Sequence, residues 1–505
     1  MKMFPIKNVL EMILGIDVRS LAIFRICLAI VVIADLILRF EDIEIFFTDY
    51  GAFPRIFQMD KLASPWDISI HFISGTYAFQ VILFLLHGIS AMFLLFGYKT
   101  RFATVLVWIF NHSLYFRNPA ITYAGDIILR LILFWSMFLP LGVKYSIDSL
   151  MNPDKEQPKQ IFSIGSTAIL LQVAFVYFFA ALLKTGAEWH ETGNAVSHAL
   201  SDIKIVKPFG LFIKNYPLIT NSLTYFVYWL EFLGPVFLFI PVWNPIFRII
   251  LLILFTTIQI GFGLCLNLQL FPFESSLMMV PFIPGIVWDK LFYSFKDFKS
   301  KFDIVKNNFV SELITNKLFL ALIEIFPPSR PNIKSPLALE IIAACLLIFV
   351  TISNISTVYK KIKIPDEFKW INPTLGLTQK WAMFASPLSS AGWYIFSGIL
   401  SDGSNIDLNK NGEPVSFETP TLISKTYKNT RWVNFTTHLR TKERSLKCFY
   451  FSRYLCHKWN SINRGTNKEL KDIEIIFMKL FINKDLTITG PERITLWKLS
   501  CQSNY

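Results

Sequence analysis

Long apolar runs with few or no charged positions recur along the first 360 residues of the chain. Several are close to the roughly 20 residues that a helix needs to cross a hydrocarbon core about 30 Å thick. Polar positions do not interrupt them at the spacing that is typical of a soluble amphipathic helix. We therefore predict an all-α polytopic membrane helix bundle of about nine spans, at residues 21–38, 77–97, 102–117, 124–143, 161–183, 221–243, 246–265, 268–287 and 337–356.

Two further apolar runs, Val9 to Ile16 and Leu318 to Phe326, are too short to cross that core. We interpret both as interfacial helices, which lie along the membrane surface. The chain then divides into an interfacial N-terminal segment, a bundle of spans, a basic cytoplasmic loop with an interfacial helix, a last transmembrane helix and an extracytoplasmic domain, at residues 1–20, 21–290, 291–336, 337–356 and 357–505.

The pattern changes after about Lys360. Short β-prone runs such as Trp393 to Leu400 are separated by the turn pairs Asp402-Gly403 and Asn411-Gly412. A basic stretch from Arg431 to Asn463 is typical of a helix. Two more strand-like runs follow it, at residues 473–482 and 493–499. We predict a small α+β extramembrane C-terminal domain.

Composition supports a lipid environment, because hydrophobic residues make up 53% of the chain and include 50 Phe. The formal net charge of +13 could indicate a nucleic-acid partner. The basic residues, however, lie in loops and in the tail beside apolar helices, where anionic headgroups and topology signals account for them. We therefore expect membrane lipids, and no nucleic acid, as partners.

The loop charges also predict an orientation. If the N-terminus is cytoplasmic, the loops on the cytoplasmic side carry about twice as many Lys and Arg as the loops on the other side. With nine spans the C-terminal domain is then outside. The seven histidines and six cysteines show neither an HExxH nor a CxxC spacing, so we expect no metal site.

A series of short motifs accompanies the apolar runs. They are Phe24-Arg25 with Asp35 and Arg39, Asp49-Tyr50-Gly51, Pro54-Arg55, Gly97-Tyr98-Lys99-Thr100-Arg101, Arg117-Asn118-Pro119, Gly125-Asp126, Phe138-Leu139-Pro140-Leu141-Gly142, Tyr145-Ser146-Ile147-Asp148 and Lys184-Thr185-Gly186-Ala187-Glu188-Trp189. Together, in this order, they resemble the HTTM (horizontally transferred transmembrane) domain, the membrane part of the vitamin K-dependent gamma-carboxylase family, over roughly residues 15–290.

The tail is similar to that of larger bacterial members of this family. The resemblance rests on Gln379-Lys380-Trp381-Ala382-Met383-Phe384, Gly392-Trp393, Asp402-Gly403 and Arg431-Trp432. It implies a multi-pass protein of the bacterial inner membrane.

The resemblance implies a base. In the carboxylases a lysine near the lumenal end of the fifth span deprotonates vitamin K hydroquinone, and Lys184 occupies the matching place. An ammonium half-sunk in apolar surroundings loses hydration, which favours the free amine that a base requires. The resemblance therefore implies a reduced quinone as cofactor, with Lys184 as the candidate catalytic residue and Glu188, Trp189, Asn267 and Glu231 as candidate substrate-binding residues.

Each of these residues also has a simpler interpretation. Lys184 can extend toward headgroups from a helix end, and Trp189 can belong to the interfacial aromatic belt. Glu188 can be a solvated loop acid. Glu231 lies in mid-span, where a carboxyl group must be neutral, paired or facing a polar cavity. The same holds for other intramembrane charges, namely Arg25, Asp35, Asp126 and Arg130. We expect some of them to pair inside the bundle, which is a folding role, with a direct catalytic role as the alternative.

Departures from the carboxylase pattern argue against glutamate carboxylation. Pro119 stands where animal carboxylases have a histidine, and Gln259 and Leu264 stand in a segment where the family often has another. Neither can relay a proton as imidazole does. Only about 145 residues follow Lys360, whereas animal carboxylases carry a much larger lumenal region.

Three hypotheses stay open at this level. The first is a quinol-oxidising, epoxidase-like enzyme with Lys184 as base. The second is a noncatalytic membrane anchor or partner-binding protein, which the missing histidines favour. The third and weakest is a transporter, for which no half-helix symmetry is evident.

Overall fold

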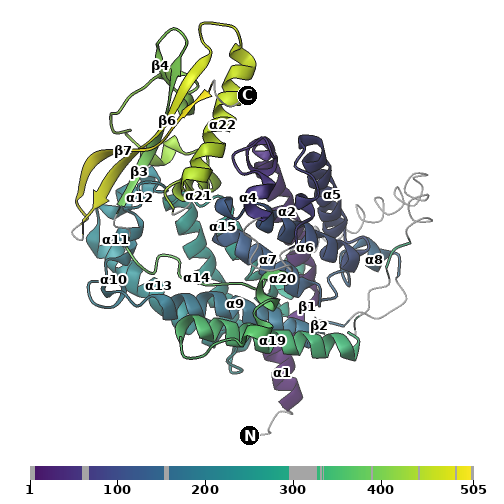
Figure 1. Ribbon diagram of the computed structural model, residues 1–505. Coiled ribbons are helices and arrows are strands. Elements are labelled where there is room, and N and C mark those ends of the chain that lie inside the picture. The colour runs from purple at the N-terminus through teal and green to yellow at the C-terminus, as the bar shows by residue number, and fades with distance from the viewer. Residues whose placement is uncertain are drawn as a thin grey trace.

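The computed structural model describes residues 6–59, 68–152, 158–294, 327–329, 333, 335–387, 390–441, 444–483 and 486–501. Within them, a bundle of helices carries a small β-sheet with two helices at one end (Figure 1). We call residues 390–501 the sheet domain. The first described residues lie at the opposite end of the molecule. The predicted combination of a helical membrane bundle and a small α+β domain is confirmed.

Five described helices are long and apolar enough to cross a membrane, or six if a bent pair forms one span. They are α2 (Val18–Phe40), α5 (Tyr77–Phe96), α9 (Ile164–Leu183), α14 (Asn244–Cys265) and α19 (Leu337–Val358). The bent pair comprises Phe271–Phe282 and Gly285–Leu291, which meet at 95°. The prediction of nine spans is therefore not confirmed.

Three other predicted spans are helices of a different kind. α6 (Thr100–Arg117) and α13 (Pro217–Phe237) are 18 and 21 residues long but are not apolar enough over 18 residues to count among the five. α7 (Ala124–Ser136) has only 13 residues. It ends before Pro140, because proline has no N–H to donate and disfavours a helical residue before it.

Prolines also break the predicted span at residues 268–287. It forms α15 (Phe271–Leu277), the 3-10 turn η3 (Val280–Phe282) and α16 (Gly285–Ser294). Pro281 lies in the turn and Pro284 directly precedes α16. The short apolar run at Val9 to Ile16 is largely helical, as α1 (Ile6–Leu14). The run at Leu318 to Phe326 lies outside the described residues.

Three long helices begin at the same end of the bundle, which we call the basal end. Strand β1 (Ile16–Asp17) directly precedes α2 and pairs with β2 (Gln160–Ile161), which precedes α9. Arg248, in the first turns of α14, donates through Nη2 to the carbonyl oxygen of Ile13 at 2.6 Å. The starts of α2, α9 and α14 are therefore held together.

The opposite end of the bundle contacts the sheet domain. Lys428 forms an ion pair with Asp42, just beyond α2, at 2.8 Å. The hydroxyl of Thr430 donates to the carbonyl oxygen of Asn267, just beyond α14, at 3.0 Å.

The remaining short elements are α3 (Ile43–Phe47), α4 (Arg55–Met59), η1 (Ile70–Phe72), η2 (Pro119–Ile121), α8 (Ile147–Leu150), α10 (Ala187–His190), α11 (Ala195–Ala199), α12 (Pro208–Lys214), η4 (Asp366–Phe368), α20 (Ile371–Thr374), η5 (Leu408–Lys410) and η6 (Ile423–Thr426).

The sheet is antiparallel, with the strand order β5-β4-β3-β6-β7. Its strands are β3 (Ser390–Leu400), β4 (Asn405–Asp407), β5 (Glu413–Pro414), β6 (Leu470–Ile482) and β7 (Ile488–Ser500). Two helices, α21 (Thr430–His438) and α22 (Arg444–Asn463), accompany it. Phe451 of α22 packs on Phe396 of β3 and on Phe435 of α21, so the three elements share one core.

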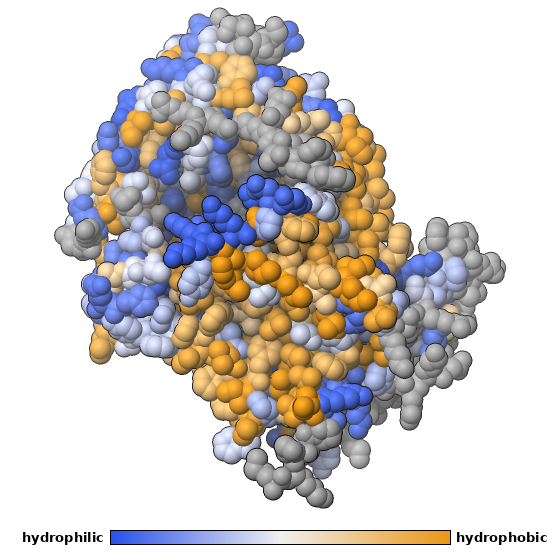
Figure 2. All heavy atoms as spheres, turned by 60° about the horizontal axis from the view of Figure 1, so that its bottom comes forward, coloured by the Kyte–Doolittle hydropathy of each residue, from blue (hydrophilic) through white to orange (hydrophobic). Residues whose placement is uncertain are grey.

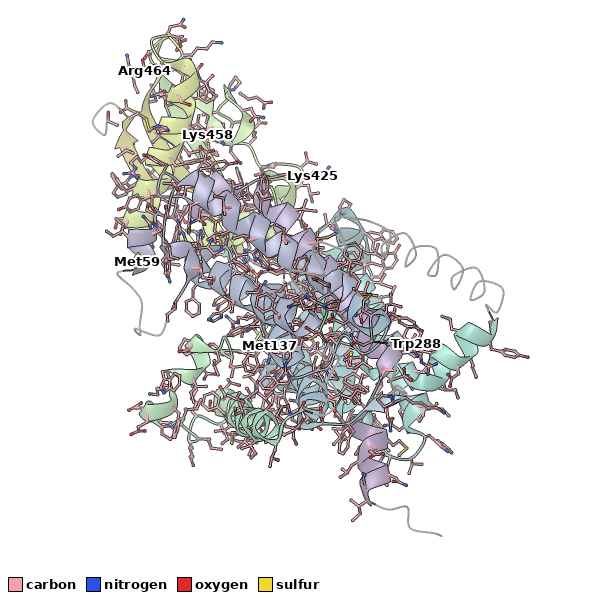
Figure 3. All side chains as sticks on the ribbon, turned by 90° about the vertical axis from the view of Figure 1, so that its right-hand side faces the viewer. Met59, Met137, Trp288, Lys425, Lys458 and Arg464 are labelled. Atoms are coloured by element: carbon pink, nitrogen blue, oxygen red, sulfur yellow. A yellow bond between two sulfur atoms is a disulfide. The ribbon has the colours of Figure 1, made fainter. Side chains whose placement is uncertain are left out.

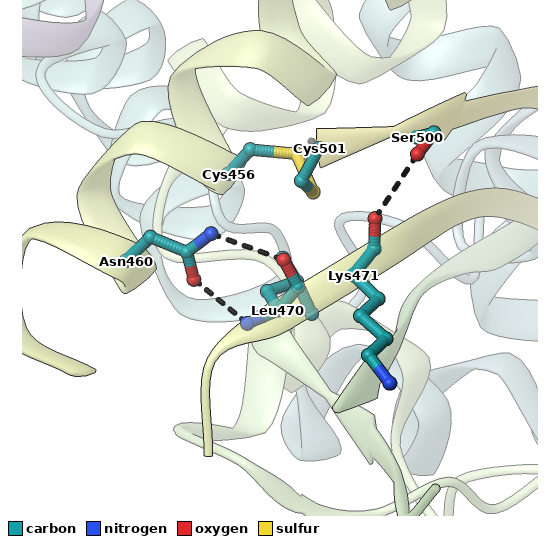
Figure 4. Close-up of a disulfide and its surroundings, with 6 residues drawn as sticks. All are labelled: Cys456, Asn460, Leu470, Lys471, Ser500 and Cys501. Carbon is teal, nitrogen blue, oxygen red and sulfur yellow. Dashed lines mark hydrogen bonds between the residues drawn. A yellow bond between two sulfur atoms is a disulfide. The ribbon is translucent and has the colours of Figure 1, made fainter. Parts of the chain in front are cut away.

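A disulfide joins Cys456 of α22 to Cys501 at the end of β7 (Figure 4). Next to it, the side-chain amide of Asn460 makes two hydrogen bonds to the backbone of Leu470. It donates to the carbonyl oxygen at 3.0 Å and accepts from the N–H at 2.7 Å. This disulfide could not be predicted from the sequence, because its cysteines are 45 residues apart and no spacing motif marks them.

Residues 371–384, between α19 and the sheet, return into the bundle. Gln379 accepts from Gln172 of α9 at 2.8 Å and from the indole of Trp381 at 2.9 Å. Arg130 of α7 donates to the carbonyl oxygen of Thr378 at 2.8 Å. This segment therefore fills the interior of the bundle rather than linking two separate bodies.

The outer surface of the bundle is apolar over a broad area (Figure 2). Exposed large apolar side chains project from α5, α13, α14 and α19, among them Ile82, Leu85, Ile89, Trp229, Ile253, Ile260, Ile341 and Ile348. A soluble protein rarely exposes so large a contiguous apolar surface, so these faces are suited to contact lipid.

Candidate functional site

Lys184 lies where α9 ends, with its side chain turned into the bundle. Its side chain is 4% exposed, and its Nζ forms an ion pair and hydrogen bond with Oε2 of Glu231 in the middle of α13. A lysine that merely reaches for headgroups keeps its ammonium in water. Lys184 instead lies within the protein, next to the carboxylate of Glu231, which its mid-span position predicted to be paired.

The indole ring of Trp189 lies against one side of this ion pair. Its ring centroid lies 5.0 Å from Lys184 Nζ, within reach of a cation–π interaction. Its indole N–H donates to the carbonyl oxygen of Phe384 at 3.0 Å. Trp189 is buried, so it does not belong to an exposed aromatic belt. Residues 371–384 thus reach the Lys184 pair as well.

Two polar side chains lie within the same part of the bundle. Tyr177 is two helical turns before Lys184 on α9, so both project from one face. Its ring packs on Phe255 of α14 at 4.1 Å. Neither its hydroxyl nor Oε1 of Gln259 makes a hydrogen bond of normal geometry in the described structure, although both are buried. Such groups gain from a polar ligand or water.

Of the other candidate residues, Glu188 lies near this cluster and Asn267 lies at the junction with the sheet domain. Glu188 is adjacent to Trp189, and its carboxylate folds back over Gly186, where a Cβ would come within 2.0 Å of Oε1. His190 contacts the backbone oxygen of Lys184 through Nε2 at 2.6 Å, not the amine. Asn267 lies instead at the junction with the sheet domain, bonded through its backbone to Ile205 and Thr430.

A second buried polar cluster joins the bundle to the sheet domain. Arg39 donates to Asp35 at 2.7 Å and to Asp126 at 2.5 Å. Arg431 of α21 donates to Asp35 at 2.5 Å and to Asp126 at 2.9 Å. All four side chains are at most 5% exposed. Two guanidinium groups therefore balance two carboxylates.

Arg431 remains charged in this cluster. Burial by itself would lower the pKa of its guanidinium, but the carboxylates of Asp126 and Asp35 raise that pKa well above its ordinary value. The sequence motif Arg431-Trp432 marked this residue as part of the family resemblance only. Its partners could not be predicted, because they lie about 300 and 400 residues away along the chain.

The expectation of internal charge pairing was therefore correct for Asp35 and Asp126, although their partners are Arg39 and Arg431. Arg25 and Arg130 are not among the paired residues, because their guanidinium groups donate to backbone carbonyls within the described residues. Arg25 donates to Tyr145 O at 2.6 Å, and Arg130 lies 3.9 Å from the ring of Tyr115. Backbone oxygens can satisfy a buried guanidinium without an acid.

Among the described residues, no three His, Cys, Asp or Glu side chains gather in a way that could hold a metal ion. Comparison with known proteins gave one match. The model of a family described as the HTTM domain matches residues 15–288, which include Lys184, Glu231 and Asp126 but not Arg431. No curated protein and no solved structure matches the chain.

Proposed function

The chain belongs to the HTTM domain family, and from this premise we propose that it is a membrane enzyme that oxidises a reduced quinone, with Lys184 as the base. The observation that carries the proposal is the buried pair of Lys184 and Glu231 beside Trp189. Burial and pairing inside the bundle remove hydration from both ions, which distinguishes Lys184 from a lysine that only reaches for headgroups.

The carboxylate of Glu231 is positioned to accept a proton from Lys184. Transfer from Nζ to Oε2 leaves an amine and a carboxylic acid, both neutral and both compatible with a dry site. The amine then accepts the proton of a quinol hydroxyl group. The quinolate reacts with O₂, one oxygen atom enters the ring as an epoxide, and the other leaves as water with the two quinol protons.

Trp189, Tyr177 and Gln259 are suited to hold such a substrate. The indole offers a flat apolar surface to a quinone ring. The hydroxyl of Tyr177, two helical turns from Lys184, and the amide of Gln259 offer polar contacts. A lipid-soluble quinol can reach this place sideways from the bilayer. Glu188 and Asn267 are the weaker candidates for substrate binding, since Asn267 lies at the domain junction.

The experiment is oxygen-dependent conversion of a reduced naphthoquinone to its epoxide by the purified protein in detergent. Wild type should turn over, whereas Lys184→Ala, Lys184→Arg and Lys184→Gln should each lose about 10² to 10⁴-fold, the usual contribution of a general base. Lys214→Ala, on the neighbouring α12, is the matched control and should retain full activity. Equal turnover by Lys184→Ala would overturn the proposal.

The alternative is a noncatalytic anchor that presents the sheet domain to a partner. It is favoured by the Arg431 cluster, which fixes the domain on the bundle through four short contacts. The same variants discriminate the two functions. An anchor retains folding and partner binding with Arg at position 184, because Arg keeps a cation beside Glu231, and wild type then shows no quinol turnover.

We also propose the finer topology, with nine crossings, a cytoplasmic N-terminus and the sheet domain outside the bacterial inner membrane. The loop charges support it, and so does the disulfide of Cys456 and Cys501, because disulfides persist in oxidising compartments. Paired reporter fusions after residue 294 and residue 501 test it. A cytoplasmic signal from the second fusion would refute it.

A further inference from the structure

A cavity of about 610 Å³ opens at the basal end of the bundle, far from the Lys184 pair along α9. It lies where α1, the β1–β2 pair and the first turns of α2, α14 and α16 meet. Its volume falls within the roughly 300–1,000 Å³ that small-molecule sites occupy. The cavity therefore has room for more than a single small ion.

The described part of its lining is predominantly cationic. Among the described residues, four basic and two acidic side chains line it, namely Arg19, Lys144, Lys159 and Arg248, and Asp17 and Asp289. Arg19 forms ion pairs with both acids, with Asp17 at 2.8 Å and with Asp289 at 2.6 Å. This excess of basic side chains in the described lining favours an anionic ligand.

Arg248 is the most informative of them. Its side chain is buried, at 4% exposure, yet within the described residues it bonds only carbonyl oxygens, those of Leu238 and Ile13. Its Nη1 makes no hydrogen bond there. An anion in the cavity would accept a charge-assisted hydrogen bond from this nitrogen.

The surroundings of the cavity are those of a membrane interface. The starts of three candidate spans meet there, and the ends of spans lie at headgroup depth. Exposed apolar side chains adjoin it on α1 and at the start of α14, among them Leu10, Met12 and Ile246. The indole of Trp288, labelled in Figure 3, donates to Ser20 Oγ beside it at 2.7 Å.

From these observations we infer that the basal cavity binds the phosphate headgroup of an anionic phospholipid. The phosphate lies against Arg248 and the two lysines, where it completes the hydrogen bonding of the guanidinium. The acyl chains pass over the apolar side chains of α1 and α14. Free phosphate has the same charge chemistry but gains nothing from this apolar rim.

The test is binding of phosphatidylglycerol to the full-length protein, delipidated in detergent and observed by native mass spectrometry and thermal unfolding. Phosphatidylglycerol should bind and raise the melting temperature, whereas phosphatidylcholine should do so much less. The double variant Lys144→Gln/Lys159→Gln should bind phosphatidylglycerol roughly 30-fold more weakly, because each interfacial cation contributes about fivefold.

Lys360→Gln/Lys361→Gln, two exposed lysines beyond the other end of α19, is the matched control and should bind as wild type does. Lys159→Gln alone, at an exposed position, replaces the double variant if that one does not fold, with a roughly fivefold loss expected. Equal binding of both lipids, or unchanged binding by the variants, would overturn the inference. Stabilisation by inorganic phosphate that matches phosphatidylglycerol would overturn the assignment to a lipid.

Discussion

Arg431 of the sheet domain donates to both carboxylate oxygens of Asp126 in α7, to Oδ2 at 2.9 Å and to Oδ1 at 3.0 Å. The geometry is bidentate, which is the strong form of an arginine–carboxylate contact. Asp126 also accepts from the backbone N–H of Tyr123 at 3.0 Å, so its own position is fixed. This contact couples the stability of the sheet domain to that of the bundle.

Arg431→Ala should therefore destabilise the whole chain. It leaves two buried carboxylates with a single arginine, and loss of one partner from such a network costs about 3–5 kcal/mol. We expect a lower midpoint of thermal unfolding in detergent and faster proteolysis between the bundle and the sheet. Arg464→Ala, at an exposed position on the same domain (Figure 3), should change neither. An unchanged midpoint in Arg431→Ala would contradict the role assigned to this cluster.

Substitutions of Lys184 and Glu231 distinguish a folding role of this pair from a catalytic role. Lys184→Met and Glu231→Leu should each destabilise the protein, because each leaves a buried charge without its partner. The double variant should recover most of that stability, since apolar side chains of similar volume often replace a buried ion pair without loss. Quinol turnover should stay absent in the double variant. Recovery of turnover together with stability would show that the pair is only structural.

The disulfide makes a prediction of its own. Cys456→Ser/Cys501→Ser should lower the free energy of unfolding of the sheet domain by roughly 4 kcal/mol, from the closure entropy of a 45-residue loop. Maleimide labelling before and after reduction checks the pairing, with two additional thiols expected after reduction. Cys448→Ser, at a buried cysteine of the same helix that lies outside the disulfide, leaves that difference of two intact. Labelling of both cysteines without reduction would rule out the bond.

The sequence predicted the elements that depend on a single run of residues. A long apolar run with few charges and no internal break favours a single helix, so α2, α5, α9, α14 and α19 begin and end within about three residues of expectation. The bend at 271–291 was missed, although its prolines were visible, because a hydropathy window averages over them.

Contacts between residues that are far apart in the sequence could not be predicted from apolar runs. The mid-span position of Glu231 indicated that the carboxyl needed a partner, but only the packing of α13 on α9 identifies Lys184. In the same way, Asp35 and Asp126 had to be paired, yet one of their arginines is supplied by the sheet domain. A single sequence carries no record of which charged residues meet.

A last prediction concerns Asp202, which lies between α11 and α12, outside the candidate spans. Burial raises the pKa of its carboxyl group, and Lys204 opposes that shift only in part. A folded-state pKa above the unfolded value means that the folded state binds the proton more tightly, so the stabilising contribution is present in acid and is lost as the pH rises through the folded pKa.

Asp202→Asn removes this ionisation while keeping an oxygen that can accept from the N–H of Lys204, as Oδ1 does at 3.2 Å. We therefore expect the variant to unfold at a higher temperature than wild type at pH 7, and the difference to vanish near pH 3.5, below the ordinary aspartate value of 3.8. Asp402→Asn, at an exposed position, should show no comparable gain. A difference that persists unchanged in acid would mean that Asp202 acts through its hydrogen bond rather than through its charge.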